Sequence, residues 1–278
     1  MFIHNFRRVK FIVSLLFSLC LLPSVLWSQT CKPDELCFNS GEKISYIIYY
    51  NWGFIWLEAG EVTFEVRDTV YNGTPAYVFH GYGKTYPKYD WFYKVRDKYY
   101  AVVSKQGFQS LYFQRIVNEG STHLYREYQF KPENQEVIYY ESENSKAEKM
   151  LVVYACTMDV LSLIYFVRNI SLEKYWKNDK IPLDVILDGK EYSTYIRYLG
   201  KTDLETKEHG TFQTHLLVPN LIEGTIFNGG EDMEVYVTDD ANKIPLLINS
   251  EILVGSIKAV LKDAQNLKQP AIDYFPEK

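Results

Sequence analysis

A repeated alternation of apolar and polar residues, in short segments that end at turn signals, most constrains what this chain can fold into. In the segment Glu42–Tyr50, the side chains of Ile44, Tyr46, Ile48 and Tyr50 fall on one face. This two-residue period is typical of a strand with one buried face. The 24 tyrosines and 16 phenylalanines support the prediction, because aromatic residues favour strands.

Turn signals separate the alternating segments and predict antiparallel hairpins. Asn72-Gly73 and Asp188-Gly189 are the clearest, because both residues of such a pair tolerate the positive φ of a tight hairpin turn. About fourteen strands follow from this pattern. They are predicted over Glu42–Tyr50, Glu58–Arg67, Ala76–Gly83, Phe92–Val103, Leu111–Asn118, Thr122–Phe130, Glu136–Glu141, Ile181–Leu187, Lys190–Leu199, Lys201–Lys207, Thr211–Val218, Met233–Thr238, Ile244–Ile252 and Ser256–Asp263.

Residues 157–169 break the strand pattern and predict a helix. Apolar side chains recur there at helical spacing, Thr157 can cap the start, Asp159 suits the first turn and Arg168 the last. A short helical turn is predicted over Leu172–Trp176. A flat sheet of so many strands would curl or split. We therefore expect a mainly β fold: a large curved antiparallel sheet, half-barrel or sandwich-like, with one main covering helix near 157–169.

The N-terminus has the three-part pattern of a secretory signal peptide. Residues 7–10 carry three cations, residues 11–27 are apolar, and the chain turns polar from Ser28. We expect cleavage after Ser28, where Leu26 is an imperfect −3 residue; a retained N-terminal anchor is the alternative. The expected organisation is a signal peptide over 1–28, an N-terminal segment over 29–40, an antiparallel β domain over 41–267 and a C-terminal tail over 268–278.

Export would place the mature chain in the periplasm or outside the cell, without a stable membrane span. Disulfides persist in such oxidising compartments. Cys31 and Cys37 could close a small disulfide loop or stay unpaired. Cys156 follows an apolar stretch and is expected to be a buried thiol.

The charge balance argues against nucleic acid and anionic membrane surfaces as partners. The chain has 30 basic and 35 acidic residues, a net charge of −5. The predicted leader holds three of the basic residues and no acidic one, so the rest of the chain carries −8. Both kinds of partner favour basic patches instead.

No catalytic signature is present. The sequence has no G-x-S-x-G, H-E-x-x-H, C-x-x-C or glycine-rich phosphate loop. We therefore expect no enzymatic activity and no cofactor. A hydrolase remains a third hypothesis, for which Glu58 and Glu61 would have to face one cleft.

Metal ligands are equally sparse, and we expect no metal site. His209 and His215 lie on one expected hairpin, but zinc needs more ligands at a fixed geometry. Asp239 and Asp240 could bind calcium together with Asp203 or other nearby acids. We interpret them as turn residues, because aspartate side chains commonly bond their own backbone in turns.

Aromatic residues near two expected turns, together with two arginines, are the best candidates for a ligand site. Packing alone can account for the aromatic residues; the alternative is a groove for an apolar or sugar ligand. Each arginine would either pair with a carboxylate or face an anionic head group, because an unpaired buried charge is too costly. The hypothetical lining is Tyr46, Tyr50, Trp52, Trp56, Trp91, Arg96 and Arg197.

Six blocks occur along the chain in a consistent order: Tyr49–Trp56, Tyr93–Asp97, Ile196–Gly200, Glu223–Phe227, Val237–Pro245 and Ile252–Ala259. They resemble the bacterial domain-of-unknown-function family numbered 3108, above all its Bacteroidetes branch. The likeness runs from about Gly41 to Leu267, and it implies no activity and no catalytic residues. The hairpin from Val235 to Pro245 is also similar to the last hairpins of LolA/LolB-type lipoprotein carriers, half-barrels that shelter acyl chains; an ordinary β-turn gives the same pattern.

These observations favour a non-enzymatic envelope protein that binds a hydrophobic or amphipathic ligand, such as a lipid or acyl chain, in the concave face of its sheet. The helix could then act as a lid. The alternative is a structural or protein-interaction module with an envelope protein partner, which would bind through an exposed sheet edge.

Overall fold

The computed structural model describes residues 31–33, 35–52, 55–142, 147–206, 210–224 and 227–270. The predicted leader therefore lies outside the described residues. Among those described, no helix combines the length and apolarity that crossing a bilayer requires. The strands are β1 Lys43–Trp52, β2 Ile55–Tyr71, β3 Thr74–Thr85, β4 Arg96–Ser104, β5 Ser110–Glu119, β6 Thr122–Lys131, β7 Glu136–Glu141, β8 Ala147–Val152, β9 Lys180–Leu187, β10 Lys190–Thr206, β11 Gly210–Pro219, β12 Met233–Thr238, β13 Pro245–Glu251 and β14 Ser256–Gln265.

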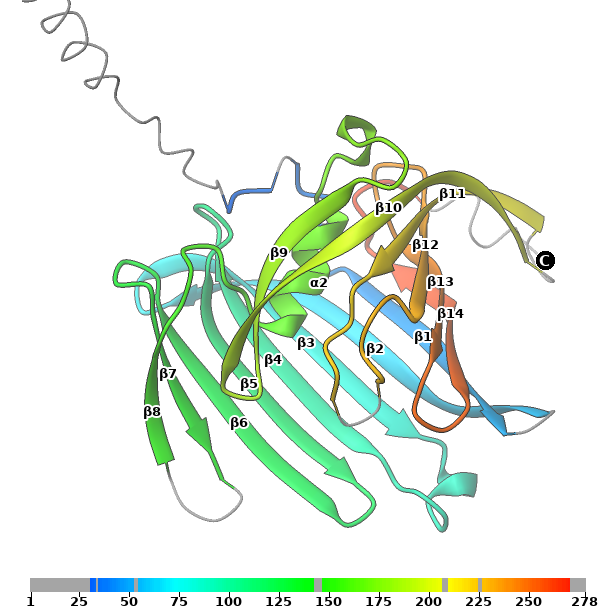
Figure 1. The fold of residues 1–278 in the computed structure, drawn as a ribbon, viewed down its shortest axis with the longest axis horizontal. Coiled ribbons are helices and arrows are strands. Elements are labelled where there is room, and N and C mark those ends of the chain that lie inside the picture. The colour runs from blue at the N-terminus through cyan, green and yellow to red at the C-terminus, as the bar shows by residue number, and fades with distance from the viewer. Residues whose placement is uncertain are drawn as a thin grey trace, which may run out of the picture.

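All fourteen strands form one antiparallel sheet, in the order β8-β7-β6-β5-β4-β3-β2-β1-β14-β13-β12-β11-β10-β9. The sheet is a meander in which β1 and β14, distant in sequence, pair at the centre. It curls so that β9 and β10 pass over helix α2 (Val160–Arg168), with β3 and β4 on the helix's other side (Figure 1). The mainly β fold with a curved antiparallel sheet and one main helix is thereby confirmed.

Two strands differ from the prediction. The segments expected over Lys190–Leu199 and Lys201–Lys207 form one strand, β10, because Gly200 takes a φ of +93° at a β-bulge and does not end it. Glycine adopts this backbone conformation at little cost. Strand β8 was not predicted, since its sequence AEKMLV has little alternation and few strand-favouring residues.

The N-cap of helix α2 lies two residues after the expected cap. Asp159, not Thr157, is its N-cap: the carboxylate accepts hydrogen bonds from the N–H groups of Leu161 (3.0 Å) and Ser162 (2.9 Å). The hydroxyl of Ser110 on β5 donates to the same carboxylate at 2.9 Å, which ties the helix start to the sheet. Burial raises the pKa of Asp159 to about 6, although these donors favour its ionised form.

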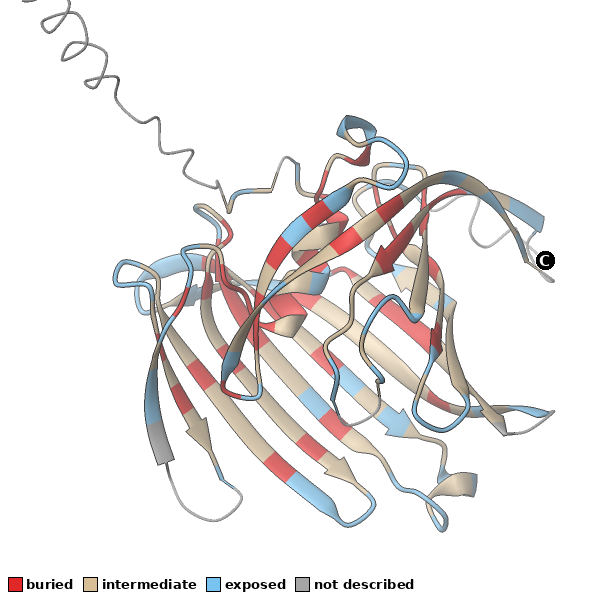
Figure 2. Ribbon diagram, in the orientation of Figure 1, coloured by how far each residue is buried: buried red, intermediate tan, exposed pale blue. Residues whose placement is uncertain are grey.

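The helix lies between two apolar clusters. On one side, Leu161 and Tyr165 pack into a core with β3–β7, where the Tyr165 ring stacks on Phe79 at 3.9 Å between centroids. On the other side, a second cluster joins the helix to β9–β12 through residues such as Leu183 and Leu217. Figure 2 shows buried segments around α2 and on β9 and β10. A helix that is apolar all round is stable only when it is covered in this way.

The disulfide prediction was wrong. Cys31 pairs with Cys156, just before α2, with a Cα–Cα distance of 5.2 Å. Cys37 is a buried free thiol, because its segment runs into the core, where Phe38 packs edge-on against Tyr165. The Cys37 N–H donates to Oδ1 of Asn169 at 2.6 Å, which holds the segment under the helix end. Cys156 is therefore not the buried thiol expected from its apolar surroundings.

The β9–β10 hairpin turn docks against the inner face of β5–β7. Asp188 accepts ion pairs from Arg115, at 3.3 Å, and from Arg126. The Gly189 N–H donates to the Tyr128 hydroxyl at 3.1 Å. These contacts join the two sides of the curled sheet below α2.

Candidate ligand-binding cavity

Between α2 and the β9–β13 side of the sheet lies a cavity of about 440 Å³. Its wall begins with the helix, where Val160, Ile164 and Val167 face it from successive turns. Ile44 and Tyr46 of β1 complete the wall on the opposite side. The other apolar residues of the wall are Phe64, Leu163, Tyr165, Leu172, Leu183, Val185, Leu187, Tyr195, Ile196, Leu217, Pro219, Leu221, Ile222, Phe227, Met233, Val235, Val237, Pro245 and Ile248.

Strand alternation explains why the wall is so apolar. On β9, every second side chain (Leu183, Val185 and Leu187) faces the cavity, and on β12 Val235 and Val237 do the same. Successive side chains of a strand point to opposite faces, so the residues between them point away from the cavity, as Ile186 does by packing into the first apolar cluster. The few polar lining residues are Thr194, Asn220, Arg168 and Lys243.

The end of the cavity at the C-terminus of α2 is closed by a buried ion pair. Arg168 donates to both carboxylate oxygens of Glu42, at 2.7 and 3.1 Å, and both side chains are almost fully buried. The guanidinium also donates to the carbonyls of Asn242 (3.0 Å) and Lys243 (3.2 Å). The Lys243 ammonium donates to the Ile170 carbonyl at 2.8 Å. Each cation is thus satisfied by protein acceptors, and the helix end is fixed to β1 and the β12–β13 turn.

The other end of the cavity is formed by the last residue of β9, Leu187, the first of β12, Met233, and the segment after β11. That segment contributes Leu221, Ile222 and Phe227. Since neighbouring strands are antiparallel, these residues lie at the rim opposite to the Arg168 ion pair. Buried polar contacts hold α2 at both its ends.

Of the predicted lining, Tyr46 is the residue that the structure brings to the cavity wall. Burial raises the pKa of its phenol, so it stays neutral. Tyr50, on the same strand, instead donates from its hydroxyl to the Val254 carbonyl at 3.0 Å. The side chain of Trp52 lies outside the described residues.

Two predicted tryptophans lie at the rim of the sheet. Trp91, between β3 and β4, is 83 % exposed. Trp56, near the start of β2, lies under the Lys258 ammonium, with 4.2 Å from Nζ to the ring centroid. Neither residue belongs to the cavity wall.

Both predicted arginines form ion pairs away from the cavity. Arg96 binds the carboxylate of Asp90 in the preceding loop, at 2.6 and 3.1 Å. Arg197 binds Glu231 with a shortest distance of 2.7 Å. Of the two alternatives expected for these arginines, the structure shows pairing with a carboxylate.

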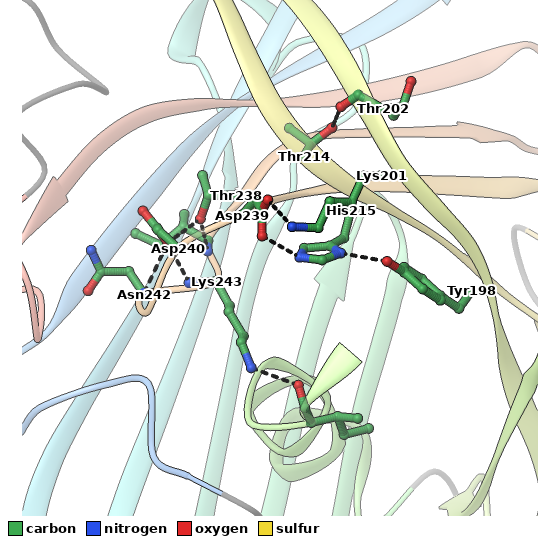
Figure 3. Close-up of polar contacts among 12 residues, drawn as sticks. Tyr198, Lys201, Thr202, Thr214, His215, Thr238, Asp239, Asp240, Asn242 and Lys243 are labelled. Atoms are coloured by element: carbon green, nitrogen blue, oxygen red, sulfur yellow. Dashed lines mark hydrogen bonds and ion pairs between the residues drawn. The ribbon is translucent and has the colours of Figure 1, made fainter. Parts of the chain in front are cut away.

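A polar network lies beside the cavity on β10, β11 and the end of β12 (Figure 3). The buried His215 contacts Asp239 Oδ1 through Nε2 (2.8 Å) and the Tyr198 hydroxyl through Nδ1 (2.8 Å). Because a carboxylate only accepts, Nε2 donates the hydrogen bond to Asp239. Partial burial opposes ionisation of Asp239, but hydrogen bonds from Lys201 and His215 lower its pKa.

Three side chains in and beside this network could in principle hold a metal ion between them. Atoms of Glu173, His215 and Asp239 lie within 4.8 Å of one another. Lys201, however, already supplies a cation to Asp239, and both ring nitrogens of His215 are engaged. Tyr198, Lys201, His215 and Asp239 therefore bond to one another, and the network connects β10, β11 and the β12–β13 turn.

The other acidic candidates also bind protein donors. Asp240 accepts from the Thr238 hydroxyl (2.7 Å) and from the N–H groups of Asn242 and Lys243 (both 3.0 Å), as expected for a turn residue. Glu61 binds Lys262 at 3.1 Å. The carboxylates of Asp240 and Glu61 are thus held by partners within the protein.

Comparison with known proteins supports the fold and gives no activity. A β-barrel-like protein of the DUF1849 domain of unknown function from Brucella abortus has a similar crystal structure, with a TM-score of 0.56 and 9 % sequence identity. The match covers 83 % of this chain and 99 % of that chain. Among curated proteins, none matches the sequence significantly.

The family model described as "Protein of unknown function (DUF3108)" matches residues 45–262. The match spans the whole sheet from β1 to β14 and most of the cavity wall, in agreement with the resemblance that the sequence blocks indicated. The chain therefore belongs to the DUF3108 family of proteins of unknown function.

Proposed function

We propose that this protein binds an apolar or amphipathic ligand of the acyl-chain class in the cavity beside α2. The observation that carries the proposal is a cavity of about 440 Å³ with an almost wholly apolar wall. Ligand pockets commonly have volumes of about 300–1,000 Å³ and a few fixed polar groups. Water is a poor occupant of such a space, because it needs two to four polar partners.

The free energy available from this wall is sufficient for binding. Each buried methylene contributes about 0.8 kcal/mol, so a segment of about eight methylenes would contribute roughly 6 kcal/mol. That corresponds to dissociation constants of roughly tens of micromolar before any polar contact is added. Thr194 and Asn220 are the uncharged polar groups that could orient an ester or carboxyl group.

We also propose that the protein works outside the cytoplasm, in the periplasm or beyond. The signal-peptide pattern supports this location, and so does the Cys31–Cys156 disulfide, because disulfides are rare in the reducing cytosol.

Binding is tested by titrating the purified chain with a dansyl-labelled undecanoic acid and following its fluorescence. Val235→Trp should obstruct the cavity and weaken binding at least ten-fold, because Val235 faces it from β12. Val70→Trp is the matched control, since Val70 is exposed near the end of β2 and should leave binding unchanged. Equal affinity of both variants and the wild type would reject the cavity as the site.

A structural or protein-interaction module is the second candidate, supported by strand β8. This strand lies at one end of the sheet order and carries the exposed apolar side chains Met150 and Val152, followed by Tyr154. Unpaired edges can accept a strand from a partner. Recovery of a stoichiometric partner that is lost in Val152→Lys, without binding of the fatty acid, would favour this candidate.

A further inference from the structure

Exposed apolar side chains gather at the rim of the sheet where β1–β2, β3–β4 and β13–β14 are connected. These three connections are neighbours, because the strands follow one another in the order β4-β3-β2-β1-β14-β13. They lie along the lower right of Figure 1. We call the exposed residues the aromatic rim: Ile55, Trp91, Phe92, Leu253 and Val254.

Hydrogen bonds and close backbone contacts tie the β3–β4 and β13–β14 connections to the neighbouring strands β2 and β1. The Tyr86 N–H donates to the Ala59 carbonyl at 3.0 Å, which joins the β3–β4 connection to β2. The Tyr50 hydroxyl binds the Val254 carbonyl, which joins β1 to the β13–β14 turn. Gly255, with a φ of +85°, lies so close to the Asn51 carbonyl that a Cβ would be 2.6 Å from it. The aromatic rim is therefore a fixed surface, with its apolar side chains held in water.

The composition of this surface fits a lipid–water interface. Trp91 and Phe92 pack edge-on, with 5.9 Å between ring centroids. Lysines flank the aromatic rings: Lys88 lies 4.9 Å from the ring centroid of Tyr89, and Lys258 lies over Trp56. Tryptophan, tyrosine and lysine are the side chains that anchor proteins at the head-group level of a bilayer.

The acids around the rim argue against attraction by charge alone. Asp90 is paired with Arg96, and Glu58 and Glu251 lie on neighbouring strands. Contact with a bilayer would therefore depend mainly on the burial of apolar side chains, in keeping with the net acidic charge of the chain.

The end of the ligand cavity formed by Leu187, Met233 and the segment after β11 lies at the same rim. Ile248 lines the cavity on β13, and the chain runs from it directly to Leu253 and Val254. The segment containing Leu221 and Ile222 reaches this end from β11. We infer that the aromatic rim docks the protein on the surface of a lipid bilayer, with the cavity opening toward the lipid. The opening of the cavity toward the lipid rests on the proposed function; the docking itself does not.

Flotation of the purified chain with vesicles of phosphatidylcholine, which carry no net charge, tests the docking. The double variant Trp91→Ala/Phe92→Ala should partition into vesicles at least ten-fold less than the wild type. Trp176→Ala is the matched control, because Trp176 is 82 % exposed but precedes β9 at the opposite rim, and should float like the wild type. Raising NaCl from about 50 to about 500 mM should change wild-type partition less than three-fold, because screening weakens charge-driven contacts only.

A wild-type chain that stays with the unbound fraction, or a double variant that floats like the wild type, overturns the docking. So does self-association of the wild type in sedimentation velocity that the double variant loses, since the rim would then bind a second copy. The fatty-acid titration without vesicles separates the two proposals. The double variant should bind the probe as the wild type does, whereas Val235→Trp should lose the probe and still float.

Discussion

Replacing Arg168 with methionine should severely destabilise the protein, because it leaves a buried carboxylate without its partner. The Glu42 side chain is fully buried, and the guanidinium of Arg168 supplies both of its ion-pair hydrogen bonds. The same substitution frees the Asn242 and Lys243 carbonyls. Breaking a buried pair in this way costs about 3–5 kcal/mol, which lowers the folded-to-unfolded ratio by roughly two to four orders of magnitude.

The free energy of unfolding, measured by urea denaturation, tests this magnitude through a double-mutant cycle. The double variant Glu42→Leu/Arg168→Met should recover much of the loss, because it removes the buried charge together with its partner. Arg197→Met breaks an exposed pair of the same chemistry and should change stability little. A loss below about 1 kcal/mol for Arg168→Met, or strictly additive effects in the cycle, would refute the view that this pair fixes the helix end.

Three further predictions concern the remaining contacts that hold the fold. Cys156→Ser should lose about 2–5 kcal/mol in urea unfolding, because the disulfide closes a separation of 125 residues. The difference in unfolding free energy between Cys37→Ala and the wild type should be the same with and without reductant, because Cys37 is not part of the disulfide. The pKa of Asp159 is about 6 when folded, above its ordinary value of 3.8, so its contribution to stability falls as pH rises through about 4 to 6. In Asp159→Asn this pH-dependent loss of unfolding free energy, which amounts to at most about 3 kcal/mol, should be absent. Plots of unfolding free energy against pH that run parallel for the variant and the wild type would contradict this prediction. Gly189→Ala should lower the melting temperature more than Gly73→Ala: both glycines have positive φ, but a Cβ at Gly189 would lie 2.8 Å from Tyr139, and at Gly73 nothing lies within 4 Å. Equal decreases in melting temperature for the two variants would show that the β9–β10 turn does not need to lie so close to Tyr139.

The local patterns of the sequence predict most of the fold. Helical spacing between Val160 and Val167 locates α2, and the Asp188-Gly189 pair locates the β9–β10 turn. The pattern could not show that Gly200 bends a strand instead of ending it, because a glycine between two alternating segments is compatible with both. Nor could it choose a disulfide, since three cysteines allow three pairings and the choice depends on how Phe38 packs.

The site was harder to predict, because its wall comes from strands far apart in the chain. The prediction relied on clusters of aromatic residues, and these gather near turns, where Trp91 and Trp56 lie at the rim. The signal that could have found the cavity is the aliphatic alternation of β9 and β12, whose apolar faces must be covered by something. The curvature of the sheet determines which apolar strand faces meet. Contacts between distant residues, such as the ion pair of Asp188 with Arg115, accompany this curvature, and local sequence patterns do not show them.

Crystallisation of the chain with a brominated fatty acid, followed by an anomalous difference map, tests the central claim most directly. The account predicts a bromine peak inside the cavity, between α2 and the side chains of Leu217, Val235 and Ile248. Bromine peaks confined to the outer surface of the sheet, at a fatty-acid concentration that saturates binding in solution, would contradict it.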